Sequence, residues 1–192
     1  QPDTTLPFDK SSEAAEPGCY KVSLQEEELA VELTASERCA VHRYLTTSSH
    51  SLFLAVDMVY RDLTQDVLLE RVSDTEIRGY RFSKAWAEDQ RIYFHAVFSR
   101  PYQWLGANHT DSKNGVTDTY ADYFYFQPSK EPLEIRVALS SVDLEGARNN
   151  LESELGMEPG LIFDQVREKA SQAWDKHLGK VQVKGGTETQ RR

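Results

Sequence analysis

The sequence predicts a mainly β protein, an antiparallel β-sandwich followed by C-terminal linker helices. Much of residues 1–140 alternates between apolar and polar side chains with the period of two that a half-buried β-strand requires. Turn-forming residues divide these runs into many short strands, as in an antiparallel sandwich. After Ser140 the apolar period becomes that of an α-helix.

Two segments show the alternation of a half-buried strand most clearly. In residues 29–33 every second residue is Leu or Val, and in residues 133–139 the odd-numbered positions are all apolar. Glu134 and Arg136 lie on the opposite face of the second segment. We expect both strands to bury one face and to turn the polar face toward solvent.

Two other segments, residues 92–98 and 119–126, carry apolar or aromatic side chains on both faces, which predicts strands covered on both sides. Asn114–Gly115 is the strongest turn signal, because both residue types tolerate the positive φ of a type I′ hairpin turn. We expect this turn to join a strand that ends near Lys113 to the aromatic strand.

A first helix is predicted after residue 143. Asp143 suits its N-cap and Gly156 suits the position after its end. Its apolar residues recur at helical spacing, at Leu144, Ala147, Leu151 and Leu155.

A second helix has an apolar stripe that includes Trp174, which we expect to lie in the core, and Gly179 ends this helix. Residues 181–183 predict a short strand. Thr187 and Gln190 have the spacing of a capping box, so another helix is expected to begin there; a frayed polar tail is the alternative.

Composition excludes several classes of partner. The chain has 192 residues, a formal net charge of −9 and no cluster of Lys or Arg, which argues against nucleic acid. No apolar run approaches the roughly 20 residues of a membrane-spanning helix. Cys19 and Cys39 are expected to be small buried hydrophobic residues, and a disulfide stays open if they lie on neighbouring strands.

Motifs for catalysis or metal binding are missing from the sequence. The five His residues have no metal-ligand spacing, and no nucleophile elbow, phosphate loop or dinucleotide motif occurs. We therefore assign no catalytic residue and no metal ligand to this chain.

Aromatic residues in connecting segments are the candidates for contact with a ligand. Trp86 and Trp104 are each placed in a connector, where an exposed indole could stack on a sugar ring. The alternative for each is packing against a neighbouring domain or the sandwich edge. With Asp89 and Gln90, they form our set of carbohydrate or interdomain contacts.

Several segments, taken in order, resemble one known family. The resemblance covers most of residues 7–192 and is carried by EPGCYKV (16–22), LTASERCAVHRY (33–44), RGYRFSKAWAEDQRIYF (78–94), SSVDLEGARNNL (140–151) and the spaced pattern of residues 163–190 that ends in GGTETQ. Together they resemble the N-terminal domain of glycoside hydrolase family 92, the bacterial exo-acting α-mannosidases, including enzymes that act on α-1,2 linkages.

The resemblance implies an N-terminal β-sandwich of the supersandwich type, linker helices and an (α/α) barrel that holds the catalytic acid, the base and the calcium ligands. It implies an inverting, calcium-assisted removal of terminal mannose from N-glycan mannosides. The expected partners are the chain's own downstream catalytic domain and a mannose-containing glycan. The implied location is secreted or periplasmic, with anchoring through an upstream segment as a further option.

The domain organisation follows from this resemblance. We expect a β-sandwich over residues 1–140, linker helices and a short strand over 141–184, and the start of a truncated barrel over 185–192. As a first hypothesis, the chain is a non-catalytic domain that supports the barrel and forms part of the sugar pocket. A free-standing carbohydrate-binding module and a purely structural sandwich are the alternatives; the helix start at Thr187 favours the first.

Overall fold

The computed structural model describes residues 6–24, 28–46, 50–110, 114–182 and 184–191. In chain order its elements are η1 (Lys10–Ser12), β1 (Ala14–Glu16), β2 (Cys19–Leu24), β3 (Leu29–Ala35), β4 (Cys39–Thr46), β5 (Leu52–Asp57), β6 (Leu63–Arg71), β7 (Glu76–Lys84), β8 (Gln90–Phe98), β9 (Gln103–His109), β10 (Tyr120–Phe126), β11 (Leu133–Ser140), α1 (Leu144–Glu154), α2 (Phe163–Leu178) and α3 (Glu188–Arg191).

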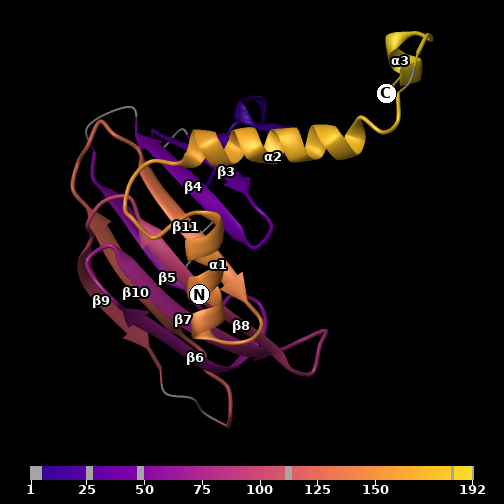
Figure 1. Ribbon diagram of the computed structural model, residues 1–192. Coiled ribbons are helices and arrows are strands. Elements are labelled where there is room, and N and C mark those ends of the chain that lie inside the picture. The colour runs from indigo at the N-terminus through magenta and orange to yellow at the C-terminus, as the bar shows by residue number, and fades with distance from the viewer. Residues whose placement is uncertain (1–5, 25–27, 47–49, 111–113, 183, 192) are drawn as a thin grey trace.

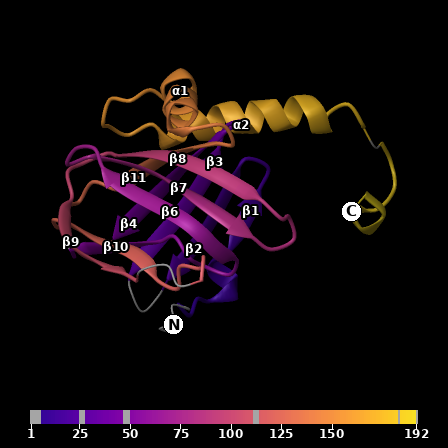
Figure 2. The ribbon, with the colours of Figure 1, turned by 90° about the horizontal axis from the view of Figure 1, so that it is seen from below.

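The strands form two antiparallel sheets that face each other, which confirms the predicted sandwich. The large sheet has the order β1-β2-β3-β4-β11-β8-β7-β6, and the small sheet has the order β5-β10-β9. Helices α1 and α2 cover the other face of the large sheet, so the large sheet is the middle of three layers (Figures 1 and 2). The small sheet is narrower than the large one, and this difference shapes the candidate site.

The main core fills the space between the two sheets. Phe98, Phe124 and Phe126 are fully buried there, and the ring of Tyr102 contacts those of Phe98 and Phe124 edge-on at 5.4 and 4.9 Å between centroids. Each fully buried ring of this kind stabilises the fold by about 1.5–3 kcal/mol. Phe98 belongs to β8, Phe124 and Phe126 belong to β10, and Tyr102 precedes β9, so the aromatic contacts join the two sheets.

β10 is covered on one face only, which corrects the prediction for residues 119–126. Phe124 and Phe126 point into the core, whereas Tyr123, directly before Phe124, points to the other face and is exposed. β8 does match the prediction over its second half, where residues 95–98 are buried on both faces.

The prediction that Glu134 and Arg136 face solvent is wrong. Their side chains lie on the helix-covered face of β11, and the two residues are 0% and 4% exposed. β11 lies in the middle of the large sheet, between β4 and β8, so its polar face lies under the helical layer.

Each of these buried charges binds the end of a helix. One Glu134 carboxylate oxygen accepts hydrogen bonds from the backbone N–H groups of Ile162 and Phe163, at 2.6 and 2.9 Å. Ile162 is the N-cap of α2 and offers no capping side chain, so the sheet supplies the missing acceptor. The Arg136 guanidinium donates to the carbonyls of Leu155 and Gly156 at 3.3 and 3.0 Å, just past the end of α1.

This arrangement matches the helix dipoles, with an anion at the start of α2 and a cation at the end of α1. Arg43 completes it. Its Nε donates to Glu134 at 3.0 Å, its two terminal nitrogens donate to Asp164 at 3.1 and 2.7 Å, and its guanidinium lies 4.2 Å over the ring of Phe163. Burial opposes the charge of Arg43, but its hydrogen bonds to Asp164 and Glu134 outweigh the effect of burial and raise the pKa of Arg43.

The predicted helix ends are confirmed. The Asp143 carboxylate accepts from Gly146 N at 2.6 Å, and Gly156 has φ +76° after α1. Thr187 N donates to the Gln190 side chain at 2.9 Å, and Gln190 N donates back to the Thr187 hydroxyl at 3.3 Å, so the capping box is formed.

Three other predictions need correction. Trp174 is 50% exposed, because the second half of α2 extends beyond the sheet (Figure 1). Val181 and Gln182 are not in a strand, and Val183 lies outside the described residues. β9 ends at His109 rather than near Lys113, which also lies outside the described residues; Asn114 and Gly115 do have positive φ, at +55° and +75°.

Cys19 and Cys39 are both buried and free, which confirms the expectation of two small buried hydrophobic residues. They lie on β2 and β4, which are separated by β3, so they are not on neighbouring strands. Burial raises the pKa of both thiols, that of Cys39 to about 12.

The buried carboxylate under α2 generates a stability prediction. Replacing Glu134 with Gln should lower the free energy of unfolding by about 3 kcal/mol, because Arg43 then keeps its charge beside an uncharged amide. Urea denaturation measures the change. Glu131→Gln, an exposed acid three residues earlier, is the control and should change it by less than about 0.5 kcal/mol; equal effects would contradict the assignment.

The exposed partner of Arg43 generates a pH prediction. The hydrogen bond from Arg43 lowers the pKa of Asp164, so this pair stabilises the fold above the unfolded-state pKa of Asp and loses its effect as the pH falls through the lower folded value. Asp164→Asn should therefore cost about 0.5 kcal/mol at pH 6 and progressively less below about pH 4. The measurement is denaturation across this pH range, with Asp175→Asn as a control; a cost independent of pH would count against the pair.

Candidate functional site

A cavity of about 660 Å³ lies between the sheets, beside the edge strand β5 of the small sheet. β4, β5, β7, β8 and β11 line it, mostly with apolar side chains such as Ile92, Val137 and Leu139. It exists because the small sheet does not extend over the whole width of the large one. Such a concave, mostly apolar space with a few polar groups is the usual form of a binding site.

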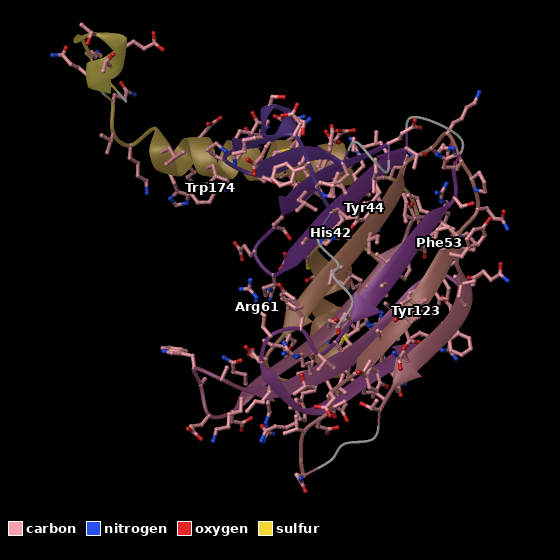
Figure 3. The ribbon with its side chains drawn as sticks, turned by 180° about the vertical axis from the view of Figure 1, so that it is seen from behind. His42, Tyr44, Phe53, Arg61, Tyr123 and Trp174 are labelled. Carbon is pink, nitrogen blue, oxygen red and sulfur yellow. The ribbon has the colours of Figure 1, made fainter. Side chains whose placement is uncertain are left out.

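The polar groups of this cavity are few and come from several strands. His42 and Tyr44 lie on β4, with 3.1 Å between His42 Nδ1 and the Tyr44 hydroxyl (Figure 3). Burial lowers the pKa of His42 and raises that of Tyr44, so both side chains are neutral at pH 7. Arg81 on β7 is fixed by Thr64 at 3.2 Å and by the carbonyl of Tyr60 at 3.1 Å. Sequence reasoning assigned no ligand contact to His42, Tyr44 or Arg81, because only the register of the strands brings them to one space.

Trp86 is at the tip of the β7–β8 hairpin, as its predicted connector position required. It is 96% exposed, so it does not pack on the sandwich edge. Asp89, in the same hairpin, accepts a hydrogen bond from Arg91 Nε at 3.0 Å. Gln90 begins β8, accepts from the Ser83 hydroxyl at 3.3 Å and lines the cavity. The structure thus brings three of the four predicted contacts to one end of the molecule.

Trp104 is elsewhere. It lies on β9 rather than in a loop, its indole N–H donates to Asp122 at 2.9 Å, and the Arg71 guanidinium lies 3.8 Å over its ring. Arg71 and the hairpin of Trp86 are at opposite ends of the β6–β7 ladder. A nine-residue strand spans roughly 30 Å, so Trp104 does not belong to the same site.

A second groove, of about 350 Å³, lies under the free half of α2. Ala170, Ala173 and Trp174 form one wall, and the β3–β4 turn at residues 35–37 forms the other. The helical period correctly showed that this stripe of α2 is apolar. It could not show that the sheet ends before the stripe does, which leaves Trp174 without a covering layer in the described residues.

Neither space is equipped for metal chemistry. Within residues 6–24, 28–46, 50–110, 114–182 and 184–191, no group of three or more His, Cys, Asp or Glu side chains could hold a metal ion. The carboxylates beside the cavity are engaged locally: Asp57 accepts from Val59 N at 2.8 Å, and Asp62 lies 3.8 Å from Arg81. Among the helices that the structure describes, none is long and apolar enough to cross a membrane.

Fold and surfaces together define a sandwich module that has helices on one face and exposes apolar recesses and the indole of Trp86. Residues 1–140 match the glycosyl hydrolase family 92 N-terminal domain, and residues 146–192 match the glycosyl hydrolase family 92 catalytic domain. The chain belongs to glycosyl hydrolase family 92. A comparison with curated proteins finds none that matches.

Solved structures of the family have the same fold. The family GH92 α-mannosidase BT3965 from Bacteroides thetaiotaomicron superimposes with a TM-score of 0.78 at 24% identity, over 94% of this chain and 26% of that one. The family GH92 inverting mannosidase BT2199 from Bacteroides thetaiotaomicron VPI-5482 has a TM-score of 0.78 at 26% identity, over 95% and 25%. The chain therefore spans about a quarter of the length of these structures.

The exposure of Trp86 generates a stability prediction. Trp86→Ala should change the free energy of unfolding by less than about 0.5 kcal/mol, because its side chain buries almost nothing in the described structure. Phe82→Ala in the same hairpin should cost about 2 kcal/mol, because its ring is partly buried and stacks on Tyr80 at 4.5 Å. Thermal and urea denaturation measure both; a large loss for Trp86→Ala would show that the indole serves the fold.

Proposed function

We propose that this chain is the non-catalytic N-terminal part of an exo-acting α-1,2-mannosidase that removes terminal mannose from N-glycan mannosides. The observation that carries the proposal is the succession of two family domains in one chain, the N-terminal one over residues 1–140 and the first part of the catalytic one over 146–192. One similar structure is described as an inverting mannosidase, and another as a complex with mannoimidazole.

The chemistry in this proposal belongs to the catalytic domain downstream. Calcium is its proposed cofactor. The described residues hold no group of three or more His, Cys, Asp or Glu side chains that could bind a metal ion, so they do not supply the carboxylates that a calcium site uses. We place the whole enzyme outside the cytoplasm, secreted or periplasmic, where N-glycan mannosides are met.

In this proposal, the present chain contributes position and one wall of the sugar pocket. Trp86 exposes its indole at the tip of the β7–β8 hairpin, and Ser83 and Gln90 of the same hairpin line the cavity. The catalytic domain would cover the free half of α2 around Trp174. Figure 3 supports this arrangement, because Trp174 and Arg61 lie on the side of the molecule on which the chain continues to α3.

The primary test compares this chain with a longer one that includes the whole catalytic domain. With an α-1,2-linked mannobiose and calcium, we expect hydrolysis by the longer chain only. Activity of the 192-residue chain alone would overturn the proposal, because the reacting carboxylates would then lie here. Sugar affinity of the short chain without any activity in the long one would favour a carbohydrate-binding module, and neither property would leave a structural sandwich.

Variants of the longer enzyme test the contribution of the hairpin. Trp86→Ala should lower kcat/KM for the mannobiose by about tenfold, the loss expected when a contact worth about 1.4 kcal/mol is removed. Phe53→Ala is the matched control, since this ring is also strongly exposed but lies on β5 and does not line the cavity. Equal rates for wild type and Trp86→Ala would remove the hairpin from the pocket.

A further inference from the structure

The outer face of the small sheet carries exposed aromatic rings. Phe53 on β5 is 72% exposed, Tyr123 on β10 is 40% exposed, and Tyr125 is partly buried. Tyr125 pairs with Phe53 and Tyr123 pairs with Ala55 across the β5–β10 ladder, so all three rings share one face. The face of an antiparallel sheet that meets water normally carries polar side chains. Exposed rings there need another explanation.

The backbone around Tyr123 leaves its ring accessible from both flanks. Its cross-strand neighbours are Ala55 on β5 and Gly106 on β9. A Cβ built on Gly106 would meet nothing within 4 Å, so the space above this position is open. The small neighbours therefore form a shallow floor on which a flat ligand can lie against the Tyr123 ring.

The polar side chains next to these rings are uncharged, and hydrogen bonds among them fix their orientation. The Tyr125 hydroxyl accepts from the Ser51 hydroxyl at 3.1 Å and donates to the Gln127 side chain at 3.4 Å. The rings of Phe53 and Tyr125 lie 5.3 Å apart with a tilt of 56°. We define the aromatic platform as Ser51, Phe53, Ala55, Gln103, Gly106, Tyr123, Tyr125 and Gln127.

The composition of the aromatic platform selects a kind of ligand. None of its members is charged, although 28% of the chain is charged and its net charge is −9. An anionic ligand or a nucleic acid requires cations, which the platform lacks. Three rings bury at most about 750 Å² even when covered completely, less than the roughly 800 Å² per partner of a stable protein interface. Aromatic faces with neutral hydroxyl and amide groups suit the apolar ring faces and hydroxyls of an uncharged sugar.

The three rings of the aromatic platform do not line the cavity of the candidate site, although Ala55 borders both. Figure 3 shows Phe53 and Tyr123 on the side of the molecule opposite Arg61 and Trp174. A domain that follows α3 and covers the free half of α2 therefore leaves the platform open to solvent. Hydrolysis and platform binding can then be measured independently.

We propose that the aromatic platform is a second, non-catalytic binding surface for uncharged oligosaccharides or polysaccharides, which holds the enzyme on a glycan while its catalytic domain acts elsewhere. The choice of a mannan as the sugar, and of an enzyme as its carrier, rests on the proposed function; the binding of an uncharged glycan by the platform does not. Stacking by Phe53 and Tyr123 supplies the affinity, and Ser51, Gln103 and Gln127 offer hydrogen bonds at the rim.

The test uses the longer enzyme and affinity gel electrophoresis in gels that contain α-mannan. We expect the mannan to retard the wild type and expect Phe53→Ala with Tyr123→Ala to raise the apparent dissociation constant at least tenfold. The same double variant should hydrolyse soluble mannobiose at the wild-type rate. Val72→Ala, an exposed apolar residue outside the platform, should be retarded like the wild type.

Further variants keep the result interpretable. Phe53→Tyr with Tyr123→Phe retains both rings and should restore retardation, and an unchanged melting temperature excludes misfolding of the alanine variant. Equal retardation of wild type and double alanine variant, or no retardation of either, would overturn the proposal. Loss of a dimer in sedimentation of the alanine variant would overturn it as well, because the platform would then bind a second copy. Hydrolysis without retardation would leave the proposed function intact, and retardation without hydrolysis would leave only the platform.

Discussion

The buried carboxylate of Glu134 is the interaction on which the arrangement of the layers depends. It lies in the central strand of the large sheet, binds the first backbone N–H groups of α2 and pairs with Arg43. Two residues along the same strand, Arg136 binds the carbonyls after α1. One strand thus fixes both helices, the first by its end and the second by its start. Apolar packing alone would hold the helices against the sheet without defining where along it each one begins.

The direction of α2 has consequences for the rest of the molecule. Its first turn is anchored by Glu134 and Arg43, and its second half extends beyond the large sheet with Trp174 on the uncovered stripe. On the other face of the large sheet, the small sheet is too narrow to cover all of it, and this leaves the cavity of His42 and Tyr44 open. Both open apolar spaces therefore arise from unequal widths of layers, a property of topology rather than of any single residue.

Local patterns in the sequence predicted much of the fold. The period of two in residues 29–33 and the cap residues Asp143 and Thr187 act through neighbouring residues, so they could be recognised without a structure. Glu134 was placed toward solvent because alternation does not tell a face that meets water from one that meets a helix. For residues 119–126 the error was the opposite one. Tyr123 is an aromatic residue, which the pattern placed in a covered position, but its side chain is exposed.

The candidate site was predictable only in part, for a related reason. The connector position of Trp86 and of its neighbours in the hairpin could be predicted because a connector is a local feature of the sequence. His42 and Arg81 meet in one cavity through strand register, and Ala55 and Gly106 flank Tyr123 in the same way. Register between strands distant in sequence depends on the complete set of pairings, which single-sequence periodicity does not contain.

The length of helix α2 amplifies small changes in its orientation. It has 16 residues, a length of roughly 24 Å, and its first turn is anchored by Glu134 and Arg43. A tilt of about 5° at that turn would displace the far end by roughly 2 Å over this length. Displacements of about 1 Å in a reacting geometry can cost a hundredfold in rate. The buried contact of Glu134 and Arg43 at the first turn of α2 would therefore affect the alignment of a domain that follows the helix.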